Sequence, residues 1–255
     1  MNTLDTAATY GNSEEVLGAA LEETGLCGKF NVITKTPIFP IETSEADAEK
    51  LIRESLERSL KRLRITKLAA VLIHNEQNLP FFPILERIVS EGYAEGAGIS
   101  LDTQEVLTRF QDIVYRAKFV QVPSNLLDRR FDAFIDSAPA RGALVFARSA
   151  YLQGALLMPI NELPPYLQGL IPWREKLEKI ALNEEMTLKE LCFRYLISLF
   201  GVTSVVFGVD NQLQIVENVS CAKKGALDPA VVEAVRSSVP LLDEHLIRPS
   251  LWGKR

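Results

Sequence analysis

The chain has 255 residues, 47% hydrophobic and 24% charged, so it is long enough to bury a full core and too apolar to be disordered. A formal net charge of −5 and a pI near 5.3 argue against nucleic acid or an anionic membrane as a partner. Three cysteines and two histidines are too few for a disulfide framework or a multi-histidine metal site, and no apolar run is long enough to span a bilayer. We therefore expect a cytoplasmic globular protein with no secretory signal and no bound metal.

The stretch 4–14 predicts a strand, a turn and the start of a helix. Asp5 ends a short strand, and the turn that follows carries Tyr10. The Asn-Ser pair after the turn caps a helix over 13–23, with two glutamates in its first turn, where carboxylates suit the positive helix end. Tyr10 is therefore expected on a loop at the carboxyl end of a strand, where barrel enzymes carry their chemistry.

Strands and helices are predicted to alternate along the rest of the chain, from β-rich apolar runs and from apolar residues at helical spacing. Further strands are expected at 30–34, 69–73, 94–99, 119–122, 143–147 and 204–207. Helices are expected at 44–63, 83–90, 103–110, 127–138, 173–183, 188–200, 211–221 and from 228 onward. The segment 150–172 carries four prolines and is predicted to be a long loop, either functional or disordered.

This alternation predicts seven strand–helix units in a single domain over residues 1–255, with a parallel sheet and right-handed crossovers. Two architectures fit the pattern, a (β/α)8 barrel and an open doubly wound sheet. No G-x-G-x-x-G motif follows the first strand, so a dinucleotide phosphate loop of the Rossmann type is unsupported. The barrel is preferred, although the count is one unit short of eight.

Polar residues recur at the carboxyl ends of the predicted strands. They are Asp5, Lys35, His74, Ser100, Asn125 and Ser149. In a parallel barrel all these ends converge on one mouth. The first three types suit proton transfer to a carbonyl oxygen from Tyr10: a tyrosine hydroxyl has a pKa of about 10, which a nearby ammonium lowers. Lys35 would supply the ammonium, Asp5 would pair with it, and His74 would orient the carbonyl.

Each of these residues also has an ordinary structural interpretation. Asp5 is then a turn residue, Lys35 a solvated charge, and His74 a core histidine bonded to backbone. The spacing alone does not decide between these interpretations and the catalytic ones.

The motifs that contain these residues resemble those of the aldo-keto reductase family, in the family's order and over essentially the whole chain. They are Asp5-Thr6-Ala7-x-x-Tyr10-Gly11-x-Ser13-Glu14, Thr34-Lys35, Leu72-Ile73-His74-Asn75, Gly98-Ile99-Ser100, Val120-Gln121-Val122-Pro123-x-Asn125-Leu126-Leu127-Asp128, Arg148-Ser149-x-x-Leu152-Gln153-Gly154, Val205-Val206-Phe207-Gly208-Val209 and Glu217-Asn218. The Arg148 motif is similar to that of bacterial members, some linked to sugar metabolism.

The resemblance implies a (β/α)8 barrel of TIM type and NAD(P)H-dependent reduction of an aldehyde or ketone, or the reverse oxidation. A sugar-like carbonyl compound is one option for the substrate. By resemblance Tyr10 is the general acid, tuned by Asp5 and Lys35, and His74 orients the carbonyl. The residues implied to bind NADP or NAD are Ser100, Gln121, Arg148, Ser149, Gly208, Gln214, Glu217 and Asn218. No metal is implied.

The chain also departs from the family pattern. The family has a complete strand–helix unit before the Asp-Thr-Ala strand, whereas four residues precede Asp5 here. We therefore expect an N-terminally truncated barrel that closes directly, stays open or is covered by a second copy in a homo-oligomer, unless the true start lies upstream. Asp210 follows Gly208 where many members carry a basic residue, which favours NAD over NADP without excluding either.

These departures leave open a second class of function. A catalytically silent or impaired barrel would act as a binding or partner protein, and a third reading is a subunit that binds nucleotide without turnover. Tyr151 is the aromatic residue closest to the Arg148 motif, and we expect it in the core or at the surface rather than over a nicotinamide ring.

Overall fold

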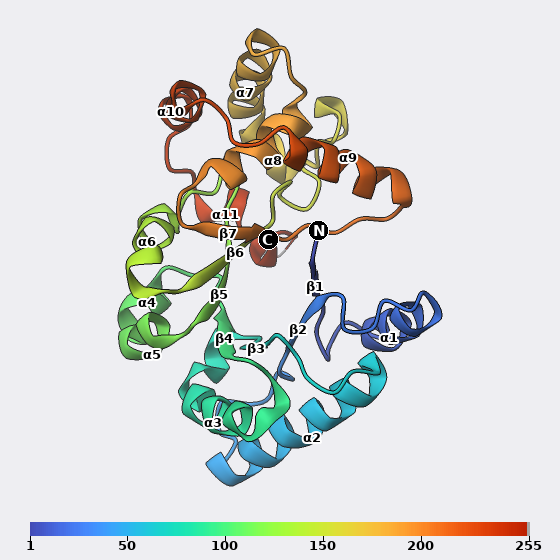
Figure 1. The fold of residues 1–255 in the computed structure, drawn as a ribbon. Coiled ribbons are helices and arrows are strands. Elements are labelled where there is room, and N and C mark those ends of the chain that lie inside the picture. The colour runs from blue at the N-terminus through green and yellow to red at the C-terminus, as the bar shows by residue number, and fades with distance from the viewer. Residues whose placement is uncertain (254–255) are drawn as a thin grey trace. The chain divides into compact units, whose positions relative to one another are not determined.

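The structure is a computed structural model that describes residues 1–253. The chain divides into two compact units, the first over Met1–Gln121 and the second beginning at Val122. Parallel strands alternate with helices in both units, as expected (Figure 1). The expectation of a single domain over residues 1–255 is not tested by this division and stays a prediction.

The first unit is organised on a parallel sheet. Its strands are β1 (Thr3–Asp5), β2 (Asn31–Lys35), β3 (Ala70–Ile73), β4 (Ala97–Ser100) and β5 (Phe119–Pro123), whose last two residues belong to the second unit. Each strand pairs with the next in chain order, and every pair is parallel. All four residues of β3 are buried, as in a strand covered on both faces. The shared direction places the carboxyl ends of β1 to β5 along one edge.

Helices connect these strands. They are α1 (Ser13–Glu23), α2 (Glu45–Leu63), the short helix η1 (Glu76–Phe81), α3 (Phe82–Ile88), the π turn η2 (Val89–Tyr93), α4 (Glu105–Arg109) and α5 (Gln111–Arg116). The predicted cap of α2 is confirmed, because the Ser44 hydroxyl accepts a hydrogen bond from the Asp47 amide at 3.2 Å. A Cβ atom on Gly18 would lie 2.1 Å from the carbonyl oxygen of Arg62, so the close packing of α1 on α2 requires glycine there.

The second unit combines a strand pair with most of the chain's later helices. Strand β6 (Leu144–Arg148) pairs in parallel with β7 (Val202–Val205), with a register shift between Val145 and Phe146. The helices are α6 (Asp132–Ser137), η3 (Pro139–Arg141), η4 (Ile160–Glu162), η5 (Pro165–Leu170), α7 (Ile171–Asn183), α8 (Leu188–Ser198), α9 (Gln212–Lys223), α10 (Pro229–Ser238), α11 (Glu244–Ile247) and η6 (Pro249–Leu251). Predicted caps at Asn211 and Asp228 are confirmed, since both side chains accept backbone N–H groups of the helices they precede.

The side-chain cap predicted at the start of α1 is absent, since Asn12 makes no capping hydrogen bond, and β7 lies two residues before the predicted 204–207. Three further local expectations differ from the structure. Helix α6 begins at Asp132 rather than 127, because the Asn125 side chain accepts the Leu127 and Asp128 amides at 2.9 Å each and holds a turn there. The helix predicted over 103–110 is followed by a second short helix, α5.

The third difference concerns the segment 150–172, which is ordered rather than an open loop. It contains η4 and η5, and five of its leucines are buried in the core of the second unit. These are Leu152, Leu156, Leu163, Leu167 and Leu170. The apolar spacing outweighs the four prolines, because Pro165 falls at the start of a helix, where its missing N–H costs nothing.

Candidate functional site

A buried ion pair stands at the carboxyl edge of the first unit's sheet. Lys35 is the last residue of β2 and is 1% exposed. Its Nζ donates to Asp5 Oδ2 at 2.7 Å and to the carbonyl oxygen of Thr6 at 2.9 Å. A buried ammonium requires such partners, because leaving its charge uncompensated would cost several kcal/mol. The solvated interpretation of Lys35 is therefore wrong.

The second carboxylate oxygen of Asp5 is held from another strand. Gln121 Nε2 on β5 donates to Asp5 Oδ1 at 3.0 Å, although the two residues are 116 apart in sequence. Gln121 is also the register partner of Ser100, the last residue of β4, and both are buried. The predicted strand-end residues thus meet along this edge, and Asp5 is fixed by both a lysine and an amide.

Tyr10 lies beside this pair on the loop between β1 and α1. Gly11 has a φ of +58°, which permits the turn after Tyr10. Lys35 Nζ lies 4.9 Å from the centroid of the Tyr10 ring, and Tyr10 is 48% exposed. His74 meets the same ring edge-on, with centroids 5.6 Å apart and planes at 79°. The phenol therefore contacts both the lysine and the histidine and remains open to solvent.

His74 follows β3 and is anchored by two threonines. Its backbone N–H donates to Thr36 Oγ1 at 3.3 Å, and its ring Nδ1 lies 3.1 Å from Thr9 Oγ1. Sequence reasoning missed both threonines. The only available signal for Thr9 was its place directly before Tyr10.

The loop that follows Ser100 is held by a glutamate that sequence reasoning also missed. Glu76, the first residue of η1, accepts the Asp102 amide at 2.5 Å, the Thr103 amide at 2.7 Å and the Thr103 hydroxyl at 2.9 Å. Three hydrogen bonds to one carboxylate fix the backbone on the carboxyl side of β4.

In the second unit, Arg148 is the last residue of β6 and Ser149 follows it directly. Arg148 Nη1 donates to Ser149 Oγ at 3.3 Å, and Asn125 Nδ2 donates to the Ser149 carbonyl at 3.1 Å. Ser149 has a φ of +66°, a left-handed conformation that a non-glycine residue adopts at a cost of about 1–3 kcal/mol. Such strain persists only where the surroundings impose it, and it clusters at functional sites.

The same motif continues in unusual backbone geometry. Leu152, Gln153 and Gly154 have φ values of +47°, +52° and +84°. Leu152 is completely buried in the unit's core, which holds the segment in this conformation. The Leu152 N–H donates to the Ser149 carbonyl at 2.9 Å, so these left-handed residues form a tight turn directly after β6.

The remaining predicted residues lie before and along α9. Gly208 precedes the helix, and the Gln214 side chain accepts the Asp210 amide at 2.8 Å, so it braces the loop that carries Asp210. Glu217 pairs with Lys189 of α8. Asn218 is 1% exposed, and its Oδ1 accepts the Tyr151 hydroxyl at 2.6 Å.

The Tyr151 contact places this ring against the core, one of the two positions expected for it. Tyr151 packs against the buried cluster of the second unit, and burial raises the pKa of its hydroxyl well above the usual range. The Tyr151 hydroxyl supplies the hydrogen bond that the buried side-chain carbonyl of Asn218 requires.

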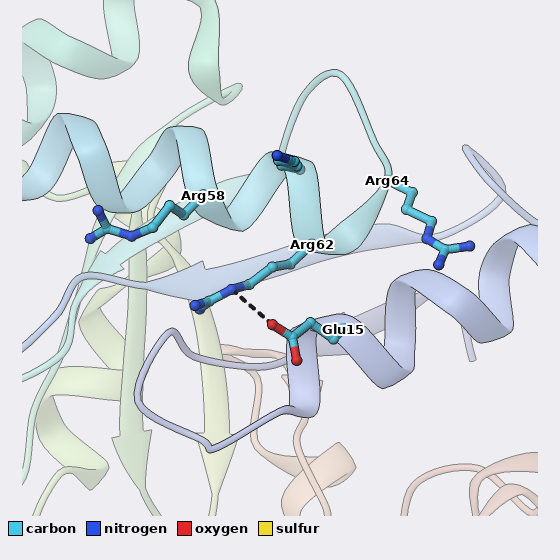
Figure 2. A pocket seen from close by; sticks show the side chains of 5 residues that line it. Glu15, Arg58, Arg62 and Arg64 are labelled. Carbon is cyan, nitrogen blue, oxygen red and sulfur yellow. Dashed lines mark ion pairs between the residues drawn. The ribbon is translucent and has the colours of Figure 1, made fainter.

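A basic hollow of about 390 Å³ lies in the first unit, and Figure 2 shows side chains that line it. It is lined by Glu15, Arg58, Lys61, Arg62 and Arg64. The arginines pair with carboxylates: Arg62 with Glu15 at 3.2 Å, Arg58 with Glu54 at 3.6 Å, and Arg64 with Glu22. Cations also suit the negative end of α2, so these charges have a structural explanation.

Two absences among residues 1–253 bear on the class of site. No group of three or more His, Cys, Asp or Glu side chains in that range is placed to hold a metal ion. Over the same range, no helix has both the length and the apolar character that crossing a bilayer demands.

Comparisons with known proteins address the family and the fold. The profile of the "Aldo/keto reductase family" matches residues 1–240. An "Uncharacterized oxidoreductase YqkF" from Bacillus subtilis is 25% identical over 93% of this chain and 83% of its own length.

Solved structures agree in fold. The holo form of aldo-keto reductase AKR11C1 from Bacillus halodurans has a TM-score of 0.78 and 21% identity, over 96% of this chain and 86% of its own. Glycerol dehydrogenase AKR11B4 from Gluconobacter oxydans gives 0.74 and 23%, over 93% and 80%. An aldo/keto reductase from Klebsiella pneumoniae, solved with NADP and acetate, gives 0.73 and 19%, over 96% and 83%.

The fold is therefore that of the aldo-keto reductase (β/α)8 barrel, with seven strands in the described part of the chain. The preference for a barrel over an open doubly wound sheet is confirmed. A profile match over 240 of the 255 residues also settles the family. The chain belongs to the aldo/keto reductase family, whose members are NAD(P)-dependent oxidoreductases of carbonyl compounds.

Proposed function

We propose that this protein reduces a small aldehyde or ketone to an alcohol, or carries out the reverse oxidation, with Tyr10 as the general acid. The observation that carries the proposal is the cluster on one sheet edge. Lys35 Nζ is 2.7 Å from Asp5 Oδ2 and 4.9 Å from the Tyr10 ring centroid, with His74 against the same ring. The exposed face of Tyr10 gives a substrate access to this cluster.

The residues fit a nicotinamide cofactor by the chemistry of their donors and acceptors. Ser100 and Gln121 are paired in register and buried, and Gln121 Nε2 donates to Asp5, so its Oε1 and the Ser100 hydroxyl suit the ring carboxamide. The Arg148 guanidinium and the Ser149 hydroxyl suit the charged phosphates. NADP or NAD, when bound, supplies or takes up the hydride.

Each protein group then has one task. Tyr10 gives its hydroxyl proton to the carbonyl oxygen as that oxygen gains charge. The Lys35 ammonium favours the tyrosinate that remains, and Asp5 keeps that ammonium in place. His74 donates a hydrogen bond that orients the carbonyl and shares its developing charge.

The other assignments are proposals of the same kind. Gly208 and Gln214 would flank the phosphate end of the cofactor, with Glu217 and Asn218 at the adenine. Asp210 would disfavour a 2′-phosphate and so favour NAD. The cytoplasm is the proposed location, supported by the buried free thiols of Cys192 and Cys221. A homo-oligomer would cover β1, the edge strand of the first unit.

The test has two measurements. Fluorescence titration with NADH and NADPH should show binding, and reduction of glyceraldehyde, chosen because one structural relative is a glycerol dehydrogenase, should depend on Tyr10. Tyr10→Phe should lower kcat/KM by about 100-fold or more, the contribution expected of a general acid, and should leave cofactor affinity within twofold. Binding without any Tyr10-dependent rate would instead support a nucleotide-binding protein that lacks turnover.

A further inference from the structure

The Glu76 carboxylate joins the chain after β3 to the chain after β4. Glu76 is the first residue of η1, and its Oε1 accepts the Asp102 and Thr103 amides at 2.5 and 2.7 Å. Its Oε2 accepts the Thr103 hydroxyl at 2.9 Å, so both oxygens bind the same short segment. That segment, residues 101–103, directly follows Ser100 at the carboxyl end of β4.

We propose that Glu76 is a positioning residue for the nicotinamide half of the cofactor, because it fixes the segment 101–103 and thereby the Ser100 hydroxyl. This inference rests on the proposed function, which assigns Ser100 to the ring carboxamide. Glu76 acts on the cofactor through the backbone that carries Ser100, and no contact between Glu76 and the cofactor is required.

The hydrogen bonds of the sheet reach Leu101, and those of Glu76 begin at the next residue. Ser100 pairs in register with Gln121, and the Leu101 N–H donates to the Gln121 carbonyl at 2.8 Å. Past Leu101 the chain has left the strand, and a strand end opens locally unless the chain beyond it is bonded. Hydrogen bonds to a carboxylate are roughly twice as strong as neutral ones, so three of them give the chain a defined path out of β4.

The turn that carries Glu76 is itself well anchored. The Asn75 side chain accepts the Gln77 amide at 3.0 Å and so caps η1. Asn78 is completely buried and donates to the Phe39 carbonyl at 2.8 Å, which ties the same turn to the segment after β2. A long side chain loses rotamer freedom when it is fixed, and the three bonds of Glu76 offset that loss.

The position of Glu76 two residues after His74 gives these bonds a functional consequence. His74 is the group proposed to orient the carbonyl, and Ser100 is proposed to hold the nicotinamide carboxamide. The short segment 74–76 therefore bears on the placement of both reactants. Transfer between two reactants depends steeply on their relative geometry, so this segment affects the rate as well as the affinity.

Calorimetric titration with two ligands tests the proposal without any turnover. NADH carries the nicotinamide and ADP-ribose lacks it; NADPH and 2′-phospho-ADP-ribose replace this pair if the protein binds NADPH instead. Glu76→Ala should raise the Kd of the reduced cofactor by about 3- to 10-fold, the worth of one hydrogen bond at Ser100, and leave that of ADP-ribose within about twofold. Glu76→Gln keeps one acceptor oxygen for the two amides and should stay within about threefold of the wild type for both ligands. An equal loss for both ligands in Glu76→Ala, or none for either, would overturn the proposal.

Amide hydrogen exchange followed by magnetic resonance measures the effect on the segment itself. The Asp102 and Thr103 amides should exchange at least about 10-fold faster in Glu76→Ala, and circular dichroism verifies that the variant folds. Glu23→Ala, at an exposed glutamate of α1, is the matched control and should change neither the exchange nor either Kd. Exchange at the wild-type rate in Glu76→Ala would contradict the inference. A wild-type protein that binds neither reduced cofactor overturns the proposed function, whereas the exchange rates still decide whether Glu76 holds the segment.

Discussion

In the first unit the candidate residues are positioned by hydrogen bonds and ring contacts with one another. In the second unit they are positioned by backbone conformation and by the core that surrounds them. Asp5 bonds both Lys35 and Gln121, and Lys35 also lies against the Tyr10 ring. In the second unit, Ser149 and Leu152 owe their positions to left-handed backbone. The difference teaches that side-chain chemistry specifies the proposed catalytic cluster, while backbone conformation specifies the proposed cofactor segment. Substitutions in the first should therefore change rates, and those in the second should change stability or cofactor affinity.

The largest expected effect is that of Lys35→Met. It removes the ammonium next to the Tyr10 ring and leaves Asp5 bonded to Gln121, so kcat/KM should fall by about 100- to 10,000-fold, the range of general acid–base contributions. Single-turnover reduction would measure it, with cofactor titration and circular dichroism to verify that the variant folds. Lys29→Met, at an exposed lysine, is the matched control and should keep the wild-type rate. Equal rates in the two variants would remove Lys35 from the mechanism.

The next effect concerns the core of the second unit. Tyr151→Phe deletes the hydroxyl that donates to the buried Asn218 carbonyl at 2.6 Å. An unsatisfied buried acceptor costs about 1–3 kcal/mol, so the urea midpoint should fall accordingly. Tyr166→Phe serves as the control, because Tyr166 is 47% exposed and its main contact is with the Trp252 ring. A Tyr151→Phe protein as stable as the control would show that Asn218 finds another donor.

The sequence predicted the parts of this comparison that local signals determine. Caps at Ser44, Asn211 and Asp228 were readable, because the capping side chain and its helix are adjacent in sequence. The strand-end positions of Asp5 and Lys35 were readable too, since apolar runs end just there.

Other parts depend on long-range contacts or on backbone geometry that no residue pattern encodes. The Gln121 bond to Asp5 and the Thr9 contact with His74 join residues 116 and 65 apart, so spacing could not reveal them. Ser149 has a positive φ that its residue type does not indicate, whereas a glycine at this position would have suggested one. The start of α6 was misplaced because the Asn125 turn competes with a helix that propensity alone favours.

A smaller effect should appear in the pH dependence of stability, through a buried carboxyl group of the second unit. Burial raises the pKa of Asp132 from 3.8 to about 6, against the opposing influence of Arg236. The folded state thus binds this proton more tightly than the unfolded state. Its contribution to stability is full below about pH 4 and is lost as pH rises through 6, by about 1–3 kcal/mol.

Asp132→Asn should remove this dependence. The difference in unfolding free energy between variant and wild type should grow in favour of the variant from pH 4 to pH 7. Urea titrations across that range would measure it, with Asp112→Asn, at an exposed carboxylate of the first unit, as the control. Parallel pH profiles for wild type and Asp132→Asn would mean that Arg236 compensates the buried charge fully.

The smallest effect tests the backbone side of the comparison directly. Ser149 at φ +66° is in a conformation that costs an L-residue about 1–2 kcal/mol and glycine almost nothing. Ser149→Gly and Ser149→Ala both lose the hydroxyl that accepts from Arg148, so their difference isolates the strain. The glycine variant should be the more stable by about 0.5–1 kcal/mol, since the greater freedom of its unfolded chain offsets part of the gain.

Both variants should weaken cofactor binding to a similar degree if the hydroxyl contacts the cofactor, and neither should lower the rate of the bound complex as Lys35→Met does. A glycine variant that binds cofactor much more weakly than the alanine variant would show that the strained backbone itself shapes the site, so that strain rather than the hydroxyl is what the second unit contributes at this position.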